Sequence, residues 1–357
     1  MTDTTIDQAR AEAFAGRLIG ILNDSALALM ISIGHRTELF DTLAALPPAS
    51  SGQIAAAAGL HERYVREWLA ALVTGGIVEY DPLARTYALP AEHAAWLTRA
   101  ASPANLAVTM QFIPVLAGVE DAIIAKFERG GGLHYHDYPR IHVVMAEDSA
   151  QTVVAALHDG ILPLVPGLTE RLRAGIDVLD LGCGEGRALI ELARPFPNSR
   201  FTGYDLTHET VATATQAAWR HGLTNLRFAA LDAAMLAERE QYDLICTFDA
   251  IHDQADPAQV LRNIRSALRP SGVYLMQDIR ADSALEGNLG HPAGAFLYTI
   301  STLHCTSVSL GGGGVGLGTA WGEQLALAML AEAGFASVSV ERLPHDMMNN
   351  YYVARPA

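Results

Sequence analysis

Three glycines at the end of a hydrophobic run give the sequence its clearest chemical signal. Residues 178–181 have the composition of a buried strand, and Gly182, Gly184 and Gly186 follow before a helix-length segment. Glycine allows a tight turn and lets a ligand approach the backbone, while the N-terminus of the next helix favours polar or anionic groups. The G-x-G-x-G spacing, with Asp180 two residues ahead, differs from the G-x-G-x-x-G of dinucleotide-binding proteins. It predicts a nucleotide-type cofactor site in this turn.

Two more acidic residues follow the next two expected strands. Asp205 comes after residues 200–204, and Asp232 comes after residues 226–230. In an open parallel sheet, ligands bind at the carboxyl ends of the strands, so these acids are expected to lie near the glycine turn. Each acid alone could also be a surface turn residue or a helix cap. Their order along the chain favours one shared site.

The segment DLGCGEG resembles the first motif of class I S-adenosylmethionine (SAM)-dependent methyltransferases. The resemblance implies SAM as the cofactor and S-adenosylhomocysteine as a product. It also implies that Asp205 binds the ribose hydroxyls and that Asp232 lies near the adenine amino group. The positions that it assigns to cofactor binding are Asp180, Gly182, Cys183, Gly184, Gly186, Asp205, Leu206, Asp232, Ala233, Phe248 and Asp249.

The segment after the fourth expected strand, DAIHDQADP, is similar to the HDWxD segment of plant phenolic and bacterial polyketide O-methyltransferases. In those enzymes the histidine deprotonates the acceptor hydroxyl, which implies His252 as a catalytic base and Asp253 as the residue that orients it. Gln254 replaces the tryptophan of that segment. A histidine here can also simply line the cofactor, so both roles stay open.

The remaining histidines suggest a substrate pocket. His134, His136 and Tyr138 belong to a loop between helical segments, and together with His304 they are the best pocket candidates. None of the histidine and cysteine pairs has the i, i+4 or CxxC spacing of a local metal site, so we expect no metal. The glycine run 311–318 lacks the Lys-Ser/Thr ending of a phosphate loop and is expected to be a mobile lid or linker.

Composition restricts the class of protein. With 357 residues, half of them hydrophobic, the chain can bury two cores, one small and one larger. Apolar stretches are interrupted before the roughly 20 residues that a membrane-spanning helix needs, and the N-terminus lacks a signal-peptide pattern, so we expect a cytoplasmic protein. The three cysteines are far apart, which indicates reduced thiols.

The charge argues against nucleic acid as a partner. The net charge is −15, whereas nucleic-acid affinity depends mainly on Lys and Arg. Residues 1–97 contain six Arg and no Lys against eleven Asp and Glu. A DNA-reading domain normally has a basic face, so we expect this region to form a dimer rather than to bind DNA.

The periodicity predicts three parts. Residues 1–100 contain two short helices, 51–60 and 61–72, and two wing strands, 77–80 and 86–89, which indicate a winged-helix domain of dimerisation type. Residues 101–172 form a helical linker that contributes to the substrate pocket. Residues 173–357 alternate strands and helices and close with an antiparallel pair, which predicts an α/β fold with a Rossmann-like seven-stranded sheet.

The whole chain is similar to the Rv2258c-like group of two-domain bacterial methyltransferases. We therefore expect methyl transfer from SAM to a small, partly apolar acceptor, and the sequence leaves open whether the nucleophilic atom is O, S, N or C. We also expect a homodimer that does not associate with a membrane. Two alternatives remain: a SAM-binding winged-helix transcription regulator, and a methyltransferase-fold enzyme with other chemistry.

Overall fold

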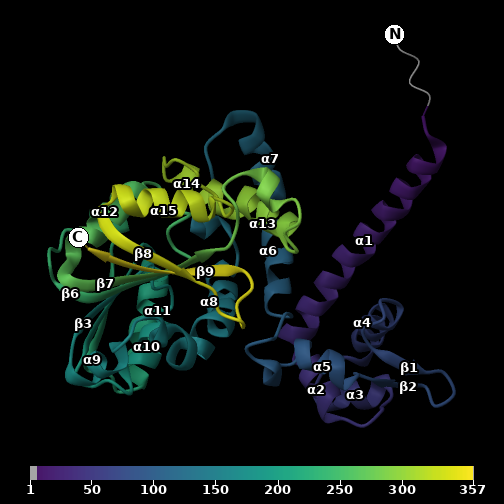
Figure 1. The fold of residues 1–357 in the computed structure, drawn as a ribbon. Helices are drawn as coiled ribbons and strands as arrows, with labels where there is room; N and C mark the ends of the chain where they lie inside the picture. The colour runs from purple at the N-terminus through teal and green to yellow at the C-terminus, as the bar shows by residue number, and fades with distance from the viewer. Residues whose placement is uncertain (1–5, 357) are drawn as a thin grey trace. The chain divides into compact units, whose positions relative to one another are not determined.

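The computed structural model describes residues 6–356 of the chain. These residues divide into two compact units, Met1–Pro114 and Val115–Ala357. Figure 1 shows a mainly helical first unit and a second unit built around one large sheet.

The first unit contains the expected winged helix-turn-helix. Its elements are α1 (Gln8–Arg36), α2 (Leu39–Ala45), α3 (Ser51–Ala58), α4 (Glu62–Thr74), β1 (Glu79–Asp81), β2 (Thr86–Ala88) and α5 (Ala91–Leu97). A capping box between Ser50 and Gln53 starts α3, and Gly59 ends it in the left-handed conformation. The antiparallel strands β1 and β2 form the wing.

The helix α4 confirms the charge balance expected for this unit. Its basic residues, Arg63 and Arg66, form ion pairs with Glu67 and Glu62 one turn away. Its apolar side packs into the core of the unit, where Trp68 lies edge-on against Phe40 with ring centroids 5.3 Å apart. The exposed side of α4 therefore carries no excess of positive charge.

The helix α1 is longer and more apolar than the sequence analysis anticipated. It has 29 residues, and an 18-residue window within it has a mean hydropathy of 1.4 with only 17% of the window buried. By length and composition alone, this helix is sufficient to cross a membrane. Alanine and glycine fill the gaps between its large apolar residues, so the hydropathy stays high even where no long run of large side chains exists.

The second unit contains a seven-stranded sheet in the order β5-β4-β3-β6-β7-β9-β8. Its strands are β3 (Asp177–Leu181), β4 (Arg200–Asp205), β5 (Leu226–Ala230), β6 (Tyr242–Phe248), β7 (Leu268–Ile279), β8 (Phe335–Glu341) and β9 (Asn349–Pro356). Strands β3 to β7 run parallel, whereas β9 is antiparallel to both β7 and β8. The predicted Rossmann-like seven-stranded sheet is thus confirmed.

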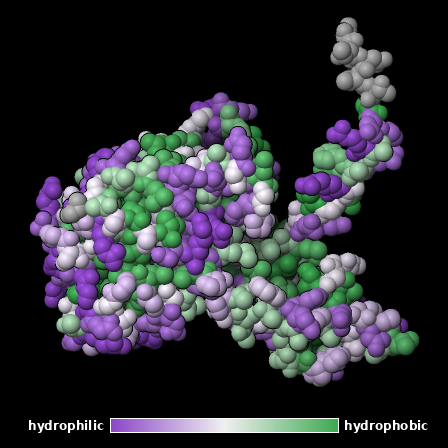
Figure 2. Space-filling model, in the orientation of Figure 1, coloured by the Kyte–Doolittle hydropathy of each residue, from purple (hydrophilic) through white to green (hydrophobic). Residues whose placement is uncertain are grey.

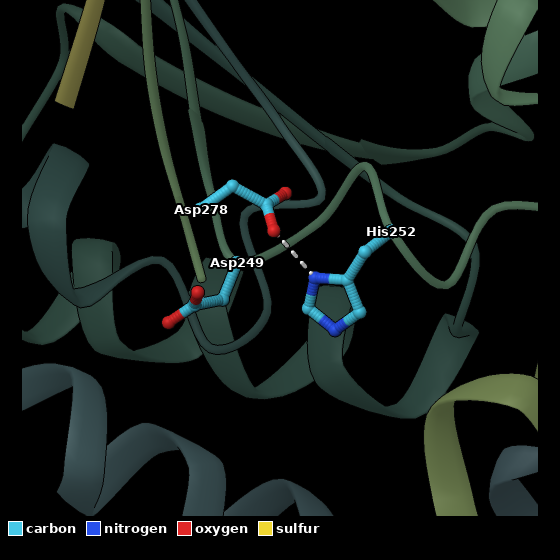
Figure 3. A group of neighbouring side chains, drawn as sticks. All are labelled: Asp249, His252 and Asp278. Carbon is cyan, nitrogen blue, oxygen red and sulfur yellow. Dashed lines mark hydrogen bonds and ion pairs between the residues drawn. The ribbon is translucent and has the colours of Figure 1, made fainter. Parts of the chain in front are cut away.

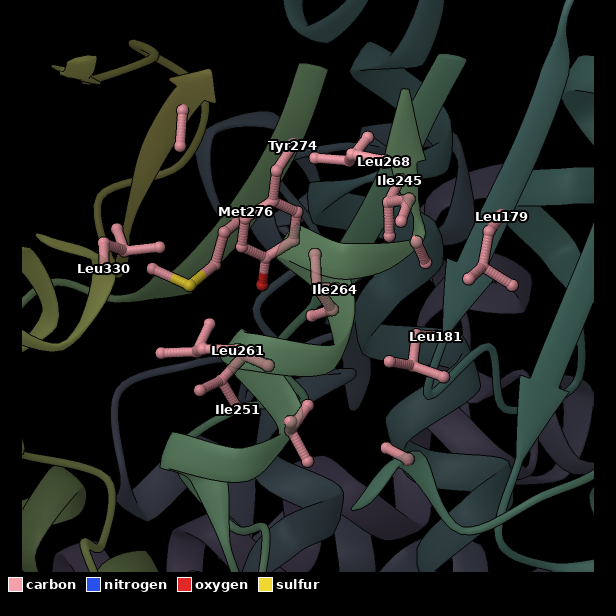
Figure 4. Packing of buried hydrophobic residues seen from close by; sticks show 14 of the residues in the cluster. Leu179, Leu181, Ile245, Ile251, Leu261, Ile264, Leu268, Tyr274, Met276 and Leu330 are labelled. Carbon is pink, nitrogen blue, oxygen red and sulfur yellow. The ribbon is translucent and has the colours of Figure 1, made fainter. Parts of the chain in front are cut away.

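The sheet buries both of its faces because its strands alternate side chains between two cores. Leu179, Leu181 and Ile245 pack on one face, which is covered by α12 (Pro257–Ala267) and α15 (Gly322–Glu332) (Figure 4). Val178 and Leu244 point to the other face, which is covered by α9 (Leu168–Ala174) and α10 (Arg187–Ala193). This arrangement is the one expected for parallel strands joined by helices.

Further helices belong to the second unit. They are α7 (Glu120–Arg129), α8 (Ile141–Thr152), α11 (His208–Arg220), α13 (Gly294–Ile300) and α14 (Thr306–Gly311), while α6 (Phe112–Ala117) spans the boundary between the two units. A π-helical turn, η9 (Ser301–Cys305), joins α13 to α14.

The glycine run 311–318 is packed against the fold, in contrast to the expected mobile lid or linker. A Cβ on Gly311 would lie 2.2 Å from the Leu133 carbonyl oxygen, and one on Gly314 would lie 2.2 Å from the Ala255 Cα. The Val315 amide also donates to the Ala255 carbonyl oxygen at 3.1 Å. Glycine is required at 311 and 314 because another stretch of backbone lies against each of them with no room for a side chain.

The closest of these backbone contacts predicts a stability effect at Gly132. A Cβ at this position would lie 1.7 Å from the Ser307 carbonyl oxygen and 2.4 Å from the Gly311 nitrogen. Because backbone atoms cannot move aside like a flexible side chain, Gly132→Ala should lower the free energy of unfolding by about 1 to 3 kcal/mol. Denaturant titration measures this change. Gly290→Ala is the control, since nothing lies within 4 Å of its added Cβ, and equal stability of the two variants would contradict the packing described here.

Candidate functional site

The glycine turn after β3 has a backbone shape that requires glycine. Gly182, Gly184 and Gly186 have φ values of 80°, 52° and 72°, which lie in the left-handed region. A Cβ on Gly182 would lie 2.6 Å from the Ala250 Cβ, and one on Gly186 would lie 2.3 Å from the Phe228 ring. At Gly184, by contrast, nothing lies within 4 Å of an added Cβ. The turn therefore packs tightly at both ends and is open in the middle.

Asp205 at the end of β4 holds this turn in place. Its Oδ2 accepts a hydrogen bond from the Gly184 amide at 2.8 Å. Its Oδ1 accepts from the Thr207 amide at 2.9 Å and from the Thr210 hydroxyl at 3.0 Å. The acid that the sequence singled out is thus brought to the glycine turn, as expected, and its neighbour Leu206 lies exposed beside it.

Asp180 on β3 is buried, and its Oδ1 has no hydrogen-bond partner within the described residues. Burial, followed by repulsion from Asp205, raises the pKa of the Asp180 carboxyl to about 7. A buried, unpaired carboxylate oxygen carries a free-energy cost of about 1 to 3 kcal/mol unless a donor reaches it. The turn therefore offers an acceptor for a polar or cationic group.

Asp232 follows β5 and begins a short 3-10 turn. Its Oδ1 accepts from the Ala234 amide at 2.9 Å, so it is a helix cap. Ala233 is buried behind it. Because β5, β4, β3 and β6 are parallel neighbours, Asp232, the glycine turn and Phe248 all follow strand ends at one edge of the sheet.

Beyond β6, the chain places His252 against the end of β7. The His252 Nδ1 donates to the Asp278 Oδ1 at 2.8 Å, and both side chains are buried (Figure 3). The same oxygen accepts from the indole of Trp321 at 3.0 Å. Asp249 adopts a positive φ of 51° and pairs its amide with the Gln277 carbonyl oxygen. Asp278 thus fixes the orientation of the imidazole.

Asp253, which we expected to orient His252, lies in a different contact. Its Oδ2 accepts from the Tyr135 hydroxyl, and its Oδ1 accepts from the Nε2 of the Gln254 side chain. Consecutive side chains in this loop point in different directions, so the imidazole reaches β7 while Asp253 reaches the loop before α8. Asp278, rather than Asp253, therefore orients the imidazole of His252.

The loop before α8 turns only some of its predicted pocket residues inward. Tyr135 begins a 3-10 turn, in which residues three apart lie on the same face. Tyr135 and Tyr138 accordingly pack edge-on against His304, with ring centroids 5.3 and 4.9 Å apart. His134 and His136 are exposed and stack on each other at 5.5 Å. Of the four predicted pocket residues, the structure brings together Tyr138 and His304.

A buried thiol lies beside this aromatic group. The Cys305 Sγ is 3.7 Å from the His304 Nδ1. Burial opposes ionisation of the thiol, but the attraction and hydrogen bond of His252 and the contact with His304 lower the pKa of Cys305 to about 6. Burial favours neutral His252, yet Asp278 and Cys305 raise the pKa of the imidazole well above its usual value.

Sequence reasoning missed Asp278, Tyr135, Cys305 and Trp321. Asp278 could have been found, because it is an acid at the end of a parallel strand, like Asp205. Tyr135 and Cys305 stood beside residues that were singled out, but a linear pattern does not tell which side chain turns inward. For Trp321 the sequence offered no signal.

The side chains of Asp249, His252 and Asp278 are of metal-ligating types, and their ligand atoms lie within 4.8 Å of one another. Hydrogen bonds from His252 and Trp321 to one oxygen of Asp278 hold two of these three side chains together. Burial, and then repulsion from Asp278, raises the pKa of Asp249 well above its usual value. The Oδ1 of Asp249 and the Oδ2 of Asp278 have no partner within the described residues.

Two regions of the chain match known protein families. Residues 25–99 match the Rv2258c-like winged HTH domain, and residues 172–308 match a methyltransferase domain. Residues 172–308 therefore carry a methyltransferase domain, preceded by a winged domain of the Rv2258c-like type. The methyltransferase domain contains the glycine turn, Asp205, His252 and Asp278, whereas the winged domain lies wholly in the first unit.

A curated protein to which this chain is similar is the malonyl-[acyl-carrier protein] O-methyltransferase of Bacillus cereus. It is 32% identical over 159 residues, which are 44% of this chain and 52% of the relative. The ubiquinone biosynthesis O-methyltransferase of Ruegeria pomeroyi is 31% identical over 31% of this chain and 44% of its own length. The chain thus spans about half or less of these relatives.

Solved structures match over nearly the full length of this chain. Human N-acetylserotonin methyltransferase, solved in complex with SAM, covers 100% of both chains at 16% identity with a TM-score of 0.67. An O-methyltransferase family protein from Burkholderia thailandensis covers 96% of this chain and 98% of its own at 13% identity with a TM-score of 0.68. At these identities the likeness establishes the two-domain fold.

The residues present fit SAM as the cofactor. The open turn at Gly184 leaves room for a ligand against the backbone, and Asp205 ends the adjacent strand. The unpaired, buried Oδ1 of Asp180 suits a cationic group, and SAM carries an ammonium and a sulfonium. These features are observed without reference to the relatives, and they agree with the family.

Proposed function

We propose that the protein transfers a methyl group from SAM to a small, partly apolar acceptor. The proposal depends on two groups of residues at the carboxyl ends of the parallel strands. A glycine turn with an unpaired buried carboxylate lies at the ends of β3 and β4, and a buried His252–Asp278 pair lies at the ends of β6 and β7. SAM, when bound, supplies an electrophilic methyl group on a sulfonium. The aromatic side chains of Tyr135 and Tyr138 suit an acceptor that is partly apolar.

In this proposal the residues around the glycine turn hold the cofactor. Asp205 would bind the ribose, and Asp232 with Ala233 would lie along the adenine. Gly182, Cys183, Gly184 and Gly186 would present their backbone, while Asp180, Phe248 and Asp249 would face the reactive end. The capping bond of Asp232 leaves its second oxygen available for this role.

Asp205 gives the sharpest test of cofactor binding. Asp205→Ala should weaken SAM affinity about 10- to 100-fold, because hydrogen bonds to a charged group contribute roughly 1.5 to 3 kcal/mol. Isothermal titration calorimetry measures the change. Asp205→Asn keeps one acceptor for the Gly184 amide and separates the loss of charge from distortion of the turn. The exposed Asp159→Ala is the control, and unchanged SAM affinity in Asp205→Ala would remove Asp205 from the cofactor site.

We propose that deprotonation of the acceptor depends on His252. It lies in the loop after β6, and its Nδ1 is fixed by Asp278, whose same oxygen accepts from the Trp321 indole. An imidazole held in one orientation can exchange a proton with an acceptor hydroxyl or thiol. Methyl transfer also needs the acceptor aligned in a dry pocket, which burial of this region supplies.

His252→Ala should lower turnover by roughly 10² to 10⁴ and leave SAM affinity nearly intact. The rates are measured with isotopically labelled SAM and one acceptor from a screen, over a range of pH. The exposed His221→Ala should behave like the wild type. A loss below about fivefold, with coinciding pH profiles, would make His252 a pocket residue. A loss of turnover on dialysis against a chelator would show instead that Asp249, His252 and Asp278 bind a metal.

We also propose that α1 joins two copies of the chain in a cytoplasmic homodimer. Large apolar side chains lie exposed along its first half, where Figure 2 shows them between polar residues. They include Phe14, Leu18, Ile19, Ile21 and Leu22. The C-terminal part of the helix packs onto the winged domain, where the Met30 carbonyl oxygen accepts from the Trp68 indole. A symmetric pair of such helices would cover the exposed stripe.

Multi-angle light scattering should give a mass of twice the 38.1 kDa of one chain. Leu18→Glu combined with Leu22→Glu should yield the monomer, because charges cannot be buried in an apolar interface without cost. Arg17→Gln, on the same stretch of helix, should stay dimeric. A monomeric wild type, or flotation of the protein with lipid vesicles, would refute the dimer helix.

A further inference from the structure

Trp321 is a buried tryptophan that donates to a charged side chain. It is 3% exposed, and its indole N–H donates to the Asp278 Oδ1 at 3.0 Å. Trp68, which is 4% exposed in the first unit, donates to a backbone group instead, the Met30 carbonyl oxygen at 2.8 Å. An indole has a single donor and no acceptor. In Trp321 that one donor goes to the carboxylate that holds His252.

Three donors meet on the same oxygen of Asp278. Its Oδ1 accepts from the His252 Nδ1 at 2.8 Å, from the Trp321 indole at 3.0 Å and from the Ile279 amide at 2.8 Å. The Ile279 amide belongs to the same strand as Asp278 and moves with it, whereas the indole comes from the N-terminus of α15. The indole therefore ties the carboxylate to a second element of the fold.

The carboxylate also decides which nitrogen of His252 is free. A carboxylate only accepts hydrogen bonds, so Nδ1 carries the hydrogen of the contact with Asp278. In the neutral imidazole the other nitrogen, Nε2, then has the lone pair that takes a proton. A base must lie within hydrogen-bond distance of the proton that it removes, and a misplacement of about 1 Å can lower the rate about 100-fold. The direction of Nε2 follows from the place of the carboxylate.

The backbone around Trp321 is locked to the segment that follows β7. Gly322 has a φ of 81°, and a Cβ there would lie 2.2 Å from the Ser283 nitrogen. The Ser283 hydroxyl donates to the Trp321 carbonyl oxygen at 2.7 Å, and the Glu323 amide donates to the Ala281 carbonyl oxygen at 3.0 Å. Only glycine permits so close an approach of two backbones. These contacts keep the start of α15, and with it the indole, beside the end of β7.

We propose that Trp321 is a positioning residue: its indole holds the Asp278 carboxylate, which in turn directs the His252 Nε2 towards the acceptor. This inference rests on the proposed function, in which His252 takes the proton of the acceptor. Trp321 touches neither the cofactor nor the acceptor in this role. Its loss should therefore lower the rate of methyl transfer and leave the affinity for both substrates nearly unchanged.

The contact can be measured without turnover. The four tryptophans give four indole N–H signals in the NMR spectrum of isotopically labelled protein. Trp321→Phe identifies the signal of Trp321, and if that variant does not fold, the other three Trp→Phe variants identify it by elimination. Asp278→Asn keeps Trp321 but should move its signal, because a hydrogen bond to a charged group is shorter and stronger than one to a neutral amide. An unchanged Trp321 signal in Asp278→Asn would overturn the proposal.

Two substitutions of Trp321 separate its donor from its packing. Phenylalanine keeps an aromatic ring but has no donor, whereas histidine is smaller but has a ring N–H in nearly the same place as the indole N–H. Trp321→Phe should lower kcat about 10- to 100-fold and change either KM less than about threefold. Trp321→His should recover most of this loss. Trp68→Phe, which removes a buried indole donor from the first unit, should keep the wild-type kcat.

The kinetic outcomes distinguish this inference from the proposed function. A wild-type kcat in Trp321→Phe, or a larger loss in Trp321→His than in Trp321→Phe, would show that the indole contributes packing alone. If His252→Ala lowers turnover as proposed and Trp321→Phe does not, the positioning role fails while the proposed function stands. If neither variant lowers turnover, both fail.

Discussion

The parallel direction of β3, β4, β5, β6 and β7 is the constraint on which the rest of the site depends. Parallel neighbours end at the same edge, so every loop that follows one of these strands opens on the same side. The glycine turn, Asp205, Asp232 and His252 are far apart in the sequence, yet all follow strands of this set. Both faces of the sheet are covered, which leaves the edge as the place where polar groups gather.

Burial sets the electrostatics of that edge. Asp180, Asp249 and Asp278 are acids removed from water, and each keeps an oxygen without a partner within the described residues. Charges at such depth interact more strongly than at the surface, because the surroundings screen them less. Loss of hydration, and then repulsion from Asp205, raises the pKa of Asp180. At His252 the attraction of Asp278 outweighs the loss of hydration and raises the pKa of the imidazole. A cationic cofactor fits these surroundings.

The segment between β7 and β8 and the loop before α8 complete the site from outside the strands. The turn η9 carries His304 and Cys305 inward, and the glycines at 132 and 311 allow the loop before α8 to approach this region closely. Tyr135 then reaches Asp253, and Tyr138 reaches the Leu303 carbonyl oxygen. The pocket side of the site is thus built by backbone contacts that only glycine permits.

The sequence by itself determined the sheet, the winged domain and the cofactor turn, because period-two apolar strands, helix caps and glycine spacing are local signals. It also located His252, but not its partner. Whether Asp253 or Asp278 holds the imidazole depends on β7 lying beside β6, a contact between residues 26 positions apart. In the same way, the 3-10 turn of the loop before α8 directs Tyr135 inward and leaves His134 and His136 exposed, and the π-helical turn η9 directs Cys305 inward. Only the tertiary structure decided these points, since side-chain direction in irregular segments is set by what packs against them.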